Sequence, residues 1–199
     1  MKKLILASGS PRRRQLLAGL DLPFEVRLLP NIDESYPDDL PAHDVALYCA
    51  TKKAEAYRPT LAPDELVITA DTVVVLPEEG DGSGALPRAS VLGKPHNEAE
   101  AEEMLARLSG RTHQVVTGVC LTTREEQRRF DVTTDVTFAK LTPEEIHYYV
   151  SHYHPMDKAG AYGVQEWIGY VAVSSLKGSF YNVMGFPVQR VYQELTHYM

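Results

Sequence analysis

The sequence predicts an α/β protein with a mixed, twisted sheet and flanking helices. Strand-like apolar runs alternate with amphipathic helical segments in the first half of the chain, a pattern that favours parallel strands joined by helices. Two later strand-like runs, at 113–123 and 130–141, flank a short charged segment and predict a hairpin, which adds an antiparallel part. At 199 residues the chain fits one domain, or one domain with an additional lobe.

The N-terminal stretch predicts a strand, a tight turn and a helix. Four apolar residues at 4–7 precede Ser-Gly-Ser at 8–10, and Pro11 suits the first position of a helix. A hydroxyl N-cap and free N–H groups at a helix start bind anions, and Arg12 and Arg13 could add bidentate phosphate contacts. The stretch therefore predicts a phosphate cradle, with a capped surface helix and solvated arginines as the alternative.

The run at 66–76 is the most β-branched of the chain and predicts a central strand that is apolar on both faces. Asp71 interrupts it. A buried carboxylate is costly unless it is paired, hydrogen-bonded or metal-bound, so Asp71 is either a satisfied structural acid or a catalytic one. Thr72 beside it and the acidic loop around Glu34 supply partners for a metal or a water, which favours the catalytic interpretation.

Periodicity and capping residues predict the rest of the architecture. The expected elements are a strand at 24–29, helices at 44–57, 98–109 and 142–153, a strand at 169–176, and a terminal helix that follows Pro187. The segment 77–90 is rich in Gly, Pro and Ser and predicts a flexible insertion loop. Gly93 and Pro95 then fix a turn that presents Lys94 outward.

Composition restricts the class of partner. The chain has 20 Lys and Arg against 27 Asp and Glu, a net charge of -7, which argues against a broad nucleic-acid surface. No stretch is long and apolar enough to predict a membrane span. Cys49 and Cys120 lack metal-ligand spacing and are expected to be buried thiols of a cytoplasmic protein. The histidines at 147, 152 and 154 match no zinc motif.

The charged candidates suit one kind of chemistry. Cations at turns and helix ends, together with two acids, favour hydrolysis of a phosphoanhydride with Mg2+ bridging carboxylates and phosphates. A P-loop kinase or a dinucleotide reductase is disfavoured because neither glycine motif is present. The candidates are Arg12, Arg13, Lys53, Lys94, Lys158, Glu34 and Asp71.

Seven blocks in order resemble the Maf family of nucleoside triphosphate pyrophosphatases, from Leu4 to Tyr192. They are ASGSPRR, KKA, ADTVV, GKP, SGxxHxVxTGV, DKAGAYGVQ and NVMGFP. The resemblance implies a cytoplasmic enzyme with a cleft between two lobes. It also implies cleavage of the α,β bond of a nucleoside triphosphate to a monophosphate and pyrophosphate, with a divalent metal such as Mg2+ or Mn2+.

The same resemblance assigns roles to individual residues. Asp71 resembles the proton acceptor of the family, and Glu34 the second acid, which would share the metal with it. The expected catalytic residues are Asp71, Lys53, Lys94 and Glu34, and the expected phosphate-binding residues are Ser8, Ser10, Arg12 and Arg13.

Substrate choice in the family divides at three positions, which here hold Arg12, Thr72 and Gln165. This set resembles the dTTP/UTP branch, whereas Trp, Gln and Glu would indicate the 7-methyl-GTP branch. Modified pyrimidine nucleotides are further candidate substrates. Two rival functions stay open, a nucleotide sensor without turnover and a phosphatase that releases orthophosphate. No nucleic-acid or membrane partner is expected, and a homodimer stays open.

Overall fold

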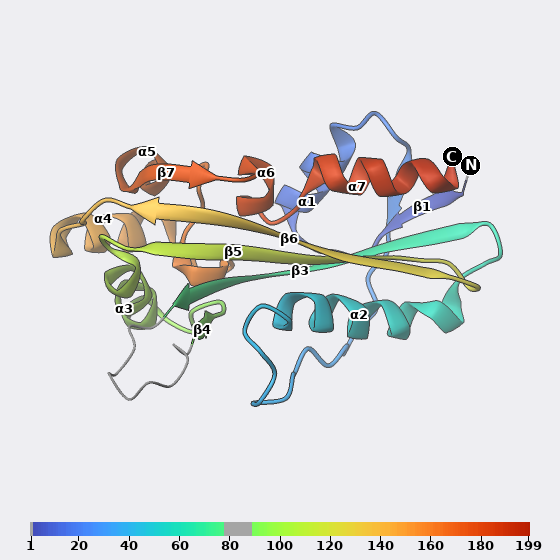
Figure 1. The fold of residues 1–199 in the computed structure, drawn as a ribbon, viewed down its shortest axis with the longest axis horizontal. Helices are drawn as coiled ribbons and strands as arrows, with labels where there is room; N and C mark the ends of the chain where they lie inside the picture. Colours follow the sequence, from blue (N-terminus) through green and yellow to red (C-terminus); the bar gives the residue numbers. More distant parts are fainter. Residues whose placement is uncertain (1, 78–88) are drawn as a thin grey trace. The chain divides into compact units, whose positions relative to one another are not determined.

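A computed structural model of the protein describes residues 2–77 and 89–199 (Figure 1). The chain forms two compact units. Unit 1 comprises Met1–Thr72, Thr117–Val132 and Gly185–Met199, and unit 2 comprises Val73–Val116 and Thr133–Met184. The insertion loop expected at 77–90 lies outside the described residues except for its ends. That expectation, and the expected cleft, stay predictions.

The strands form a mixed sheet, as the sequence predicts. It has seven strands, in the order β2-β1-β3-β5-β6-β7, with β4 paired to β3. β1 is parallel to both β2 and β3, and Leu6 of β1 is in register with Ile68 of β3. β4 is antiparallel to β3, and β7 is antiparallel to β6. Three strands continue from one unit into the other: β3 (Glu65–Pro77), β5 (Thr112–Thr122) and β6 (Gln127–Phe138).

Unit 1 has helices on both faces of its strands (Figure 1). α1 and α7 contribute Leu17 and Val191 to one buried cluster, while α2 packs Ala50 and Ala54 against Cys120 of β5 in another. Its other elements are β1 (Lys3–Leu6), α1 (Pro11–Ala18), β2 (Phe24–Val26), α2 (Val45–Tyr57), η1 (Arg58–Thr60), α7 (Val188–Leu195) and η3 (Thr196–Tyr198).

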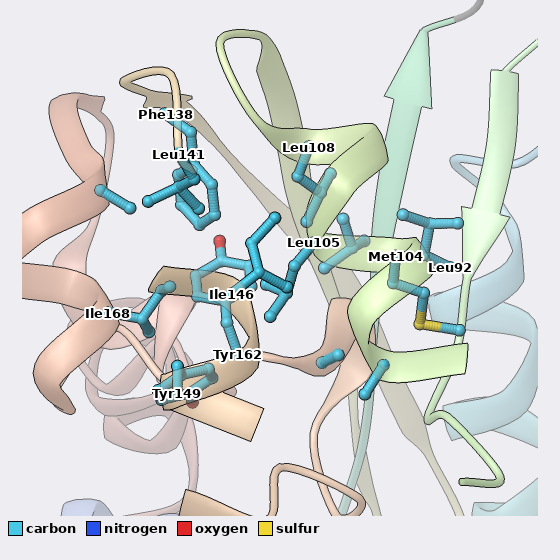
Figure 2. Packing of buried hydrophobic residues seen from close by; sticks show 14 of the residues in the cluster. Leu92, Met104, Leu105, Leu108, Phe138, Leu141, Ile146, Tyr149, Tyr162 and Ile168 are labelled. Carbon is cyan, nitrogen blue, oxygen red and sulfur yellow. The ribbon is translucent and has the colours of Figure 1, made fainter. Parts of the chain in front are cut away.

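Unit 2 contains a large apolar cluster, part of which is drawn in Figure 2. Leu105 and Leu108 of α3 pack there with Ile146 and Tyr149 of α4 and with Phe138 of β6. The other elements of unit 2 are β4 (Ala89–Leu92), α3 (Glu98–Leu108), α4 (Pro143–Tyr153), η2 (Ala159–Ala161), α5 (Trp167–Ala172), β7 (Val173–Lys177) and α6 (Phe180–Val183).

The strand expected at 169–176 is wrong over its first half, because α5 occupies Trp167–Ala172 and β7 begins only at Val173. Ile168 and Ala172 are both buried, and a spacing of four residues matches a helix. The short elements β4 and α6 were not predicted, and β2 ends at Val26, earlier than expected.

Two other expectations concern the cysteines and the membrane. Cys49 and Cys120 are both buried free thiols, as predicted. Within residues 2–77 and 89–199, every helix is too short or too polar to cross a lipid bilayer.

Candidate active site

The central strand β3 carries candidate residues on both of its faces. Ala70 packs in the cluster that contains α1 and α7, whereas Val67 packs with Tyr57 of α2. Side chains alternate along a strand, so Asp71 continues the face that α2 covers and Thr72 continues the face that α1 covers. The sequence therefore directs an acid to one helix and a hydroxyl to the other.

On the α2 face, Lys53 lies between two carboxylates. Its Nζ is 2.7 Å from Oδ1 of Asp71 and 3.3 Å from Oε1 of Glu34. The side chain of Lys53 is 12% exposed, that of Asp71 is 20% exposed and that of Glu34 is 58% exposed. The structure thus brings together three of the four expected catalytic residues.

The position of Lys53 depends on the close approach of α2 to the sheet. A Cβ added to Gly118 of β5 would lie only 2.3 Å from Cα of Leu47, so glycine is what allows this helix so near the strand. The hydroxyl of Thr69 donates a 2.7 Å hydrogen bond to the carbonyl of Ala50, which ties β3 to the same helix. Lys53 follows one turn later.

The turn after β1 forms the predicted capped helix start. Ser10 is the N-cap of α1, and its Oγ accepts a hydrogen bond from the backbone N–H of Arg13 at 3.4 Å. Pro11 occupies the first turn, as expected. The Oγ of buried Ser8 accepts from the backbone N–H of Ser10 at 3.3 Å. Arg12 is half-buried and has interactions of its own. Phosphate binding by these residues stays a prediction.

The side chain of Arg13 binds acceptors of the protein itself. Its guanidinium donates hydrogen bonds to the carbonyls of Gly185 and Ala70, each at 2.8 Å, and to the hydroxyl of Thr72 at 3.0 Å. Burial lowers the pKa of this guanidinium, and the nearby carboxylate of Asp71 opposes that shift. Phosphate binding by Arg13 also stays a prediction, although most of its donors already have protein acceptors.

The two acids are a partial fit for a divalent metal. Among the described residues, no three His, Cys, Asp or Glu side chains gather as a complete ligand set. Mg2+, however, commonly takes one or two carboxylates and completes its shell with water and substrate phosphates. Asp71 and Glu34, which converge on Lys53, match that partial donor set. They do not match a metal site made from protein ligands alone.

Lys94 and Gln165 belong to unit 2. Lys94 is exposed, as its turn predicts, and the carbonyl of Gly93 before it accepts a 3.0 Å hydrogen bond from the N–H of Gly160. The side-chain oxygen of Gln165 is buried and has no hydrogen-bond partner within the part of the chain that the structure describes.

Unit 2 also holds a buried lysine cluster. Lys158, a basic candidate of the sequence, is paired with Asp157 at 2.7 Å and with Glu166 at 3.1 Å. The hydroxyl of Tyr149 donates a hydrogen bond to Glu166. Asp157 is the direct sequence neighbour of Lys158, whereas Glu166 and Tyr149 were missed because no spacing rule links them to Lys158.

Two further residues, which contact Thr72, were also missed as individual contributors. The hydroxyl of Thr117 lies 2.9 Å from that of Thr72, and Gly185 accepts from Arg13 through its carbonyl. Both lie in family blocks, TGV and NVMGFP, but the sequence contains no local signal for such distant polar contacts.

These features define an α/β protein with a lysine-bridged acid pair and, in the same unit, a capped helix start of the kind that binds phosphate groups. The family model described as "Maf-like protein" matches residues 3–198. The chain belongs to this family, which confirms the resemblance seen in the sequence.

Similar proteins include two described as "dTTP/UTP pyrophosphatase". The one from Phocaeicola vulgatus is 58% identical over 97% of this chain and 94% of its own length. The one from Parabacteroides distasonis is 56% identical over 98% of this chain and 96% of its own length. A crystal structure of a nucleoside-triphosphatase, dITP/XTP pyrophosphatase, from Mycobacterium abscessus is 17% identical, with coverage of 98% and 94% and a TM-score of 0.45, too low to assign a fold.

Proposed function

We propose that this protein hydrolyses dTTP and UTP, and modified pyrimidine nucleotides of the same shape, to the nucleoside monophosphate and pyrophosphate. The names of relatives more than half identical over nearly the whole chain support the substrate class. The geometry that carries the reaction is the pairing of Asp71 with Lys53. One oxygen of the carboxylate contacts the lysine, and the other has no hydrogen-bond partner among the described residues.

In the proposed mechanism Asp71 is the general base. Its unpartnered oxygen takes a proton from a water whose oxygen forms a bond to the α-phosphorus. The bond between this phosphorus and the bridging oxygen breaks, and pyrophosphate leaves with the electron pair. Lys53 pairs with Asp71 and adds positive charge at the site, and Lys94 and Arg12 are proposed to neutralise charge on the phosphates. Ser8 and Ser10 add hydroxyl and backbone donors.

Glu34 and Asp71 are the residues that would hold a divalent cation, Mg2+ or Mn2+. When bound, such an ion neutralises phosphate charge and orients the triphosphate. Glu34 suits this role because its side chain is largely exposed and its contact with Lys53, at 3.3 Å, is looser than that of Asp71. A cytoplasmic location and a homodimer remain predictions.

Gln165 offers a chemical reason for pyrimidine choice. A carboxamide presents one acceptor and one donor, which match the N3–H and a neighbouring carbonyl of uracil or thymine. A carboxylate presents acceptors only, which match the donor edge of guanine. The side-chain oxygen of Gln165, which has no partner among the described residues, could accept the N3–H of a bound base. We therefore expect Gln165→Glu to lower the ratio of kcat/KM for dTTP to that for GTP by about tenfold or more, measured by pyrophosphate release.

The proposed function is tested by a product assay on the purified protein with Mg2+ and a panel of dTTP, UTP, CTP, dATP, GTP and 7-methyl-GTP. Pyrophosphate released fastest from dTTP and UTP is the expected result. Pyrophosphate from another nucleotide would keep the reaction and reject the specificity. Orthophosphate would favour a phosphatase, and nucleotide binding without turnover would favour a sensor.

A further inference from the structure

β3 extends beyond the end of β1, its parallel neighbour. Past that point the side chain of Arg13 binds the backbone of β3 in place of β1. β1 ends at Leu6, and the N–H of Ala7 makes the last contact, a 2.9 Å hydrogen bond to the carbonyl of Ile68. Backbone groups two residues apart on a strand face the same neighbour, so the next carbonyl on this edge is that of Ala70. It accepts a 2.8 Å hydrogen bond from Nη1 of Arg13.

Arg13 contacts the residues on both sides of Asp71. While Nη1 binds the carbonyl of Ala70, Nη2 donates to the hydroxyl of Thr72 at 3.0 Å. Asp71 itself points to the opposite face, where Lys53 is 2.7 Å away. The guanidinium fork therefore fixes the backbone that presents the proposed base, from the side of the strand that Asp71 does not use.

A third contact joins a distant segment. Nε of Arg13 donates to the carbonyl of Gly185 at 2.8 Å, and the hydroxyl of Thr72 lies 3.3 Å from the same carbonyl. Gly185 has a φ of +100°, which a residue with a side chain adopts only under strain. One arginine thus holds α1, β3 and the segment before α7 together within unit 1.

The hydrogen-bonding capacity of Thr72 is used within the protein. A hydroxyl offers one donor and two acceptor lone pairs. Here Arg13 donates to the Thr72 oxygen, Gly185 can accept its proton, and Thr117 fills the remaining position at 2.9 Å. The three partners match the three available positions, which leaves none for a nucleotide base.

We infer that Arg13 is a positioning residue that fixes Asp71 and Thr72, and that Thr72 acts on substrate choice through this network without contacting the base. The kinetic part of this inference rests on the proposed function. The coupling between Arg13 and Thr72 does not, because it is a property of the folded protein and is measurable without turnover.

The first test compares Arg13→Lys with Arg12→Lys and with the exposed control Arg14→Lys. Lysine keeps the charge that a phosphate ligand needs but cannot hold several acceptors at fixed angles. We expect Arg13→Lys to lower kcat for dTTP by about 100-fold. KM and the inhibition constant of pyrophosphate are expected to change by less than about threefold. A rise of tenfold or more in both KM and this inhibition constant, with kcat unchanged, would overturn the positioning role.

The second test is a double-mutant cycle of Arg13→Lys and Thr72→Val, with Thr72→Ser as the variant that keeps the hydroxyl. Because both changes break the same contact, the double variant is expected to lose little more kcat and little more resistance to denaturant than Arg13→Lys alone. Thr72→Ser is expected to keep the wild-type ratio of dTTP to GTP turnover. Additive losses in the denaturant cycle would reject the inference, even if the wild type released no pyrophosphate and the proposed function had failed.

Discussion

Each of the two units contains a lysine between two carboxylates. The two clusters are similar in exposure but differ in the hydrogen bonds of their sheltered carboxylate. Lys53 of unit 1 lies between Asp71, 20% exposed, and Glu34, 58% exposed. Lys158 of unit 2 lies between Glu166, also 20% exposed, and Asp157, also 58% exposed. In each case a largely sheltered ammonium has one sheltered and one solvated carboxylate.

The clusters differ in how many oxygens of the sheltered carboxylate have a partner. Glu166 binds Lys158 with one oxygen and accepts the Tyr149 hydroxyl with the other, and Tyr149 accepts from the N–H of Gly163 at 3.0 Å. Asp71 binds Lys53 with one oxygen only. A buried charge with every partner in place fixes a local structure, whereas one with a free oxygen can still take a proton. From this difference we propose a structural role for Lys158 and a chemical role for Lys53.

The largest expected effect follows from removing the close approach of α2 in unit 1. In Gly118→Ala the new methyl group would meet the backbone of Leu47 and Ala46 at 2.3 to 2.5 Å, which no side-chain movement relieves. We expect a loss of about 3 kcal/mol or more in the free energy of unfolding, measured by denaturant titration. The control is Gly19→Ala, where φ is -66° and the nearest atom lies at 3.4 Å. Equal stability of the two variants would contradict the account of how Lys53 is placed.

When each lysine is changed to methionine, we expect the change at Lys158 to lower mainly stability and the change at Lys53 to lower mainly turnover. Lys158→Met leaves Glu166 sheltered without its cation, at a cost of about 2–4 kcal/mol in unfolding free energy. Lys53→Met is expected to lower dTTP turnover by about 100-fold. The stability loss is expected to be smaller, because among the described residues Asp71 belongs to no chain of hydrogen bonds like the one that joins Glu166, Tyr149 and Gly163.

Lys52→Met is the matched control for this pair. Lys52 is the neighbour of Lys53 and pairs with the exposed Asp33 at 2.6 Å, so its loss is expected to change stability by less than about 1 kcal/mol. If Lys158→Met lowered turnover while Lys53→Met lowered only stability, the roles proposed for the two lysines would be contradicted.

The units should also respond to acid over different ranges. In unit 2, burial lowers the pKa of His113 from 6.5 to about 4, so its neutral form stabilises the fold above pH 6.5 and that contribution is lost as the pH falls to about 4. In unit 1, hydrogen bonds from Arg27 lower the pKa of Glu65 from 4.5 to about 2, so its contribution is lost between those values.

Unfolding free energies measured from pH 8 to pH 3 test this difference. His113→Phe is expected to remove a decline on the order of 3 kcal/mol between pH 6.5 and 4, and Glu65→Gln is expected to leave that decline unchanged. A decline that persists in His113→Phe would show that other groups carry it.

The sequence anticipated features that depend on neighbouring residues. The Ser10 cap, Pro11 and the strand around Asp71 follow from local spacing, and all three are present. Helical periodicity did not determine which of Lys52 and Lys53 meets Asp71, because the face of a helix is set by packing, here by Gly118; only the family resemblance singled out Lys53. The contact of Thr117 with Thr72 and the helical state of 167–172 likewise depend on contacts distant in the chain or on the packing of short segments.

The central claim is that the free oxygen of Asp71 takes the proton of the attacking water. The most direct measurement is pyrophosphate release from saturating dTTP by the wild type and by Asp71→Asn, with nucleotide binding and thermal unfolding measured on the same samples. Asparagine keeps the shape of the side chain and removes the base, so we expect turnover to fall by about 1,000-fold while the variant folds and binds dTTP. Near-normal turnover in Asp71→Asn would contradict the account.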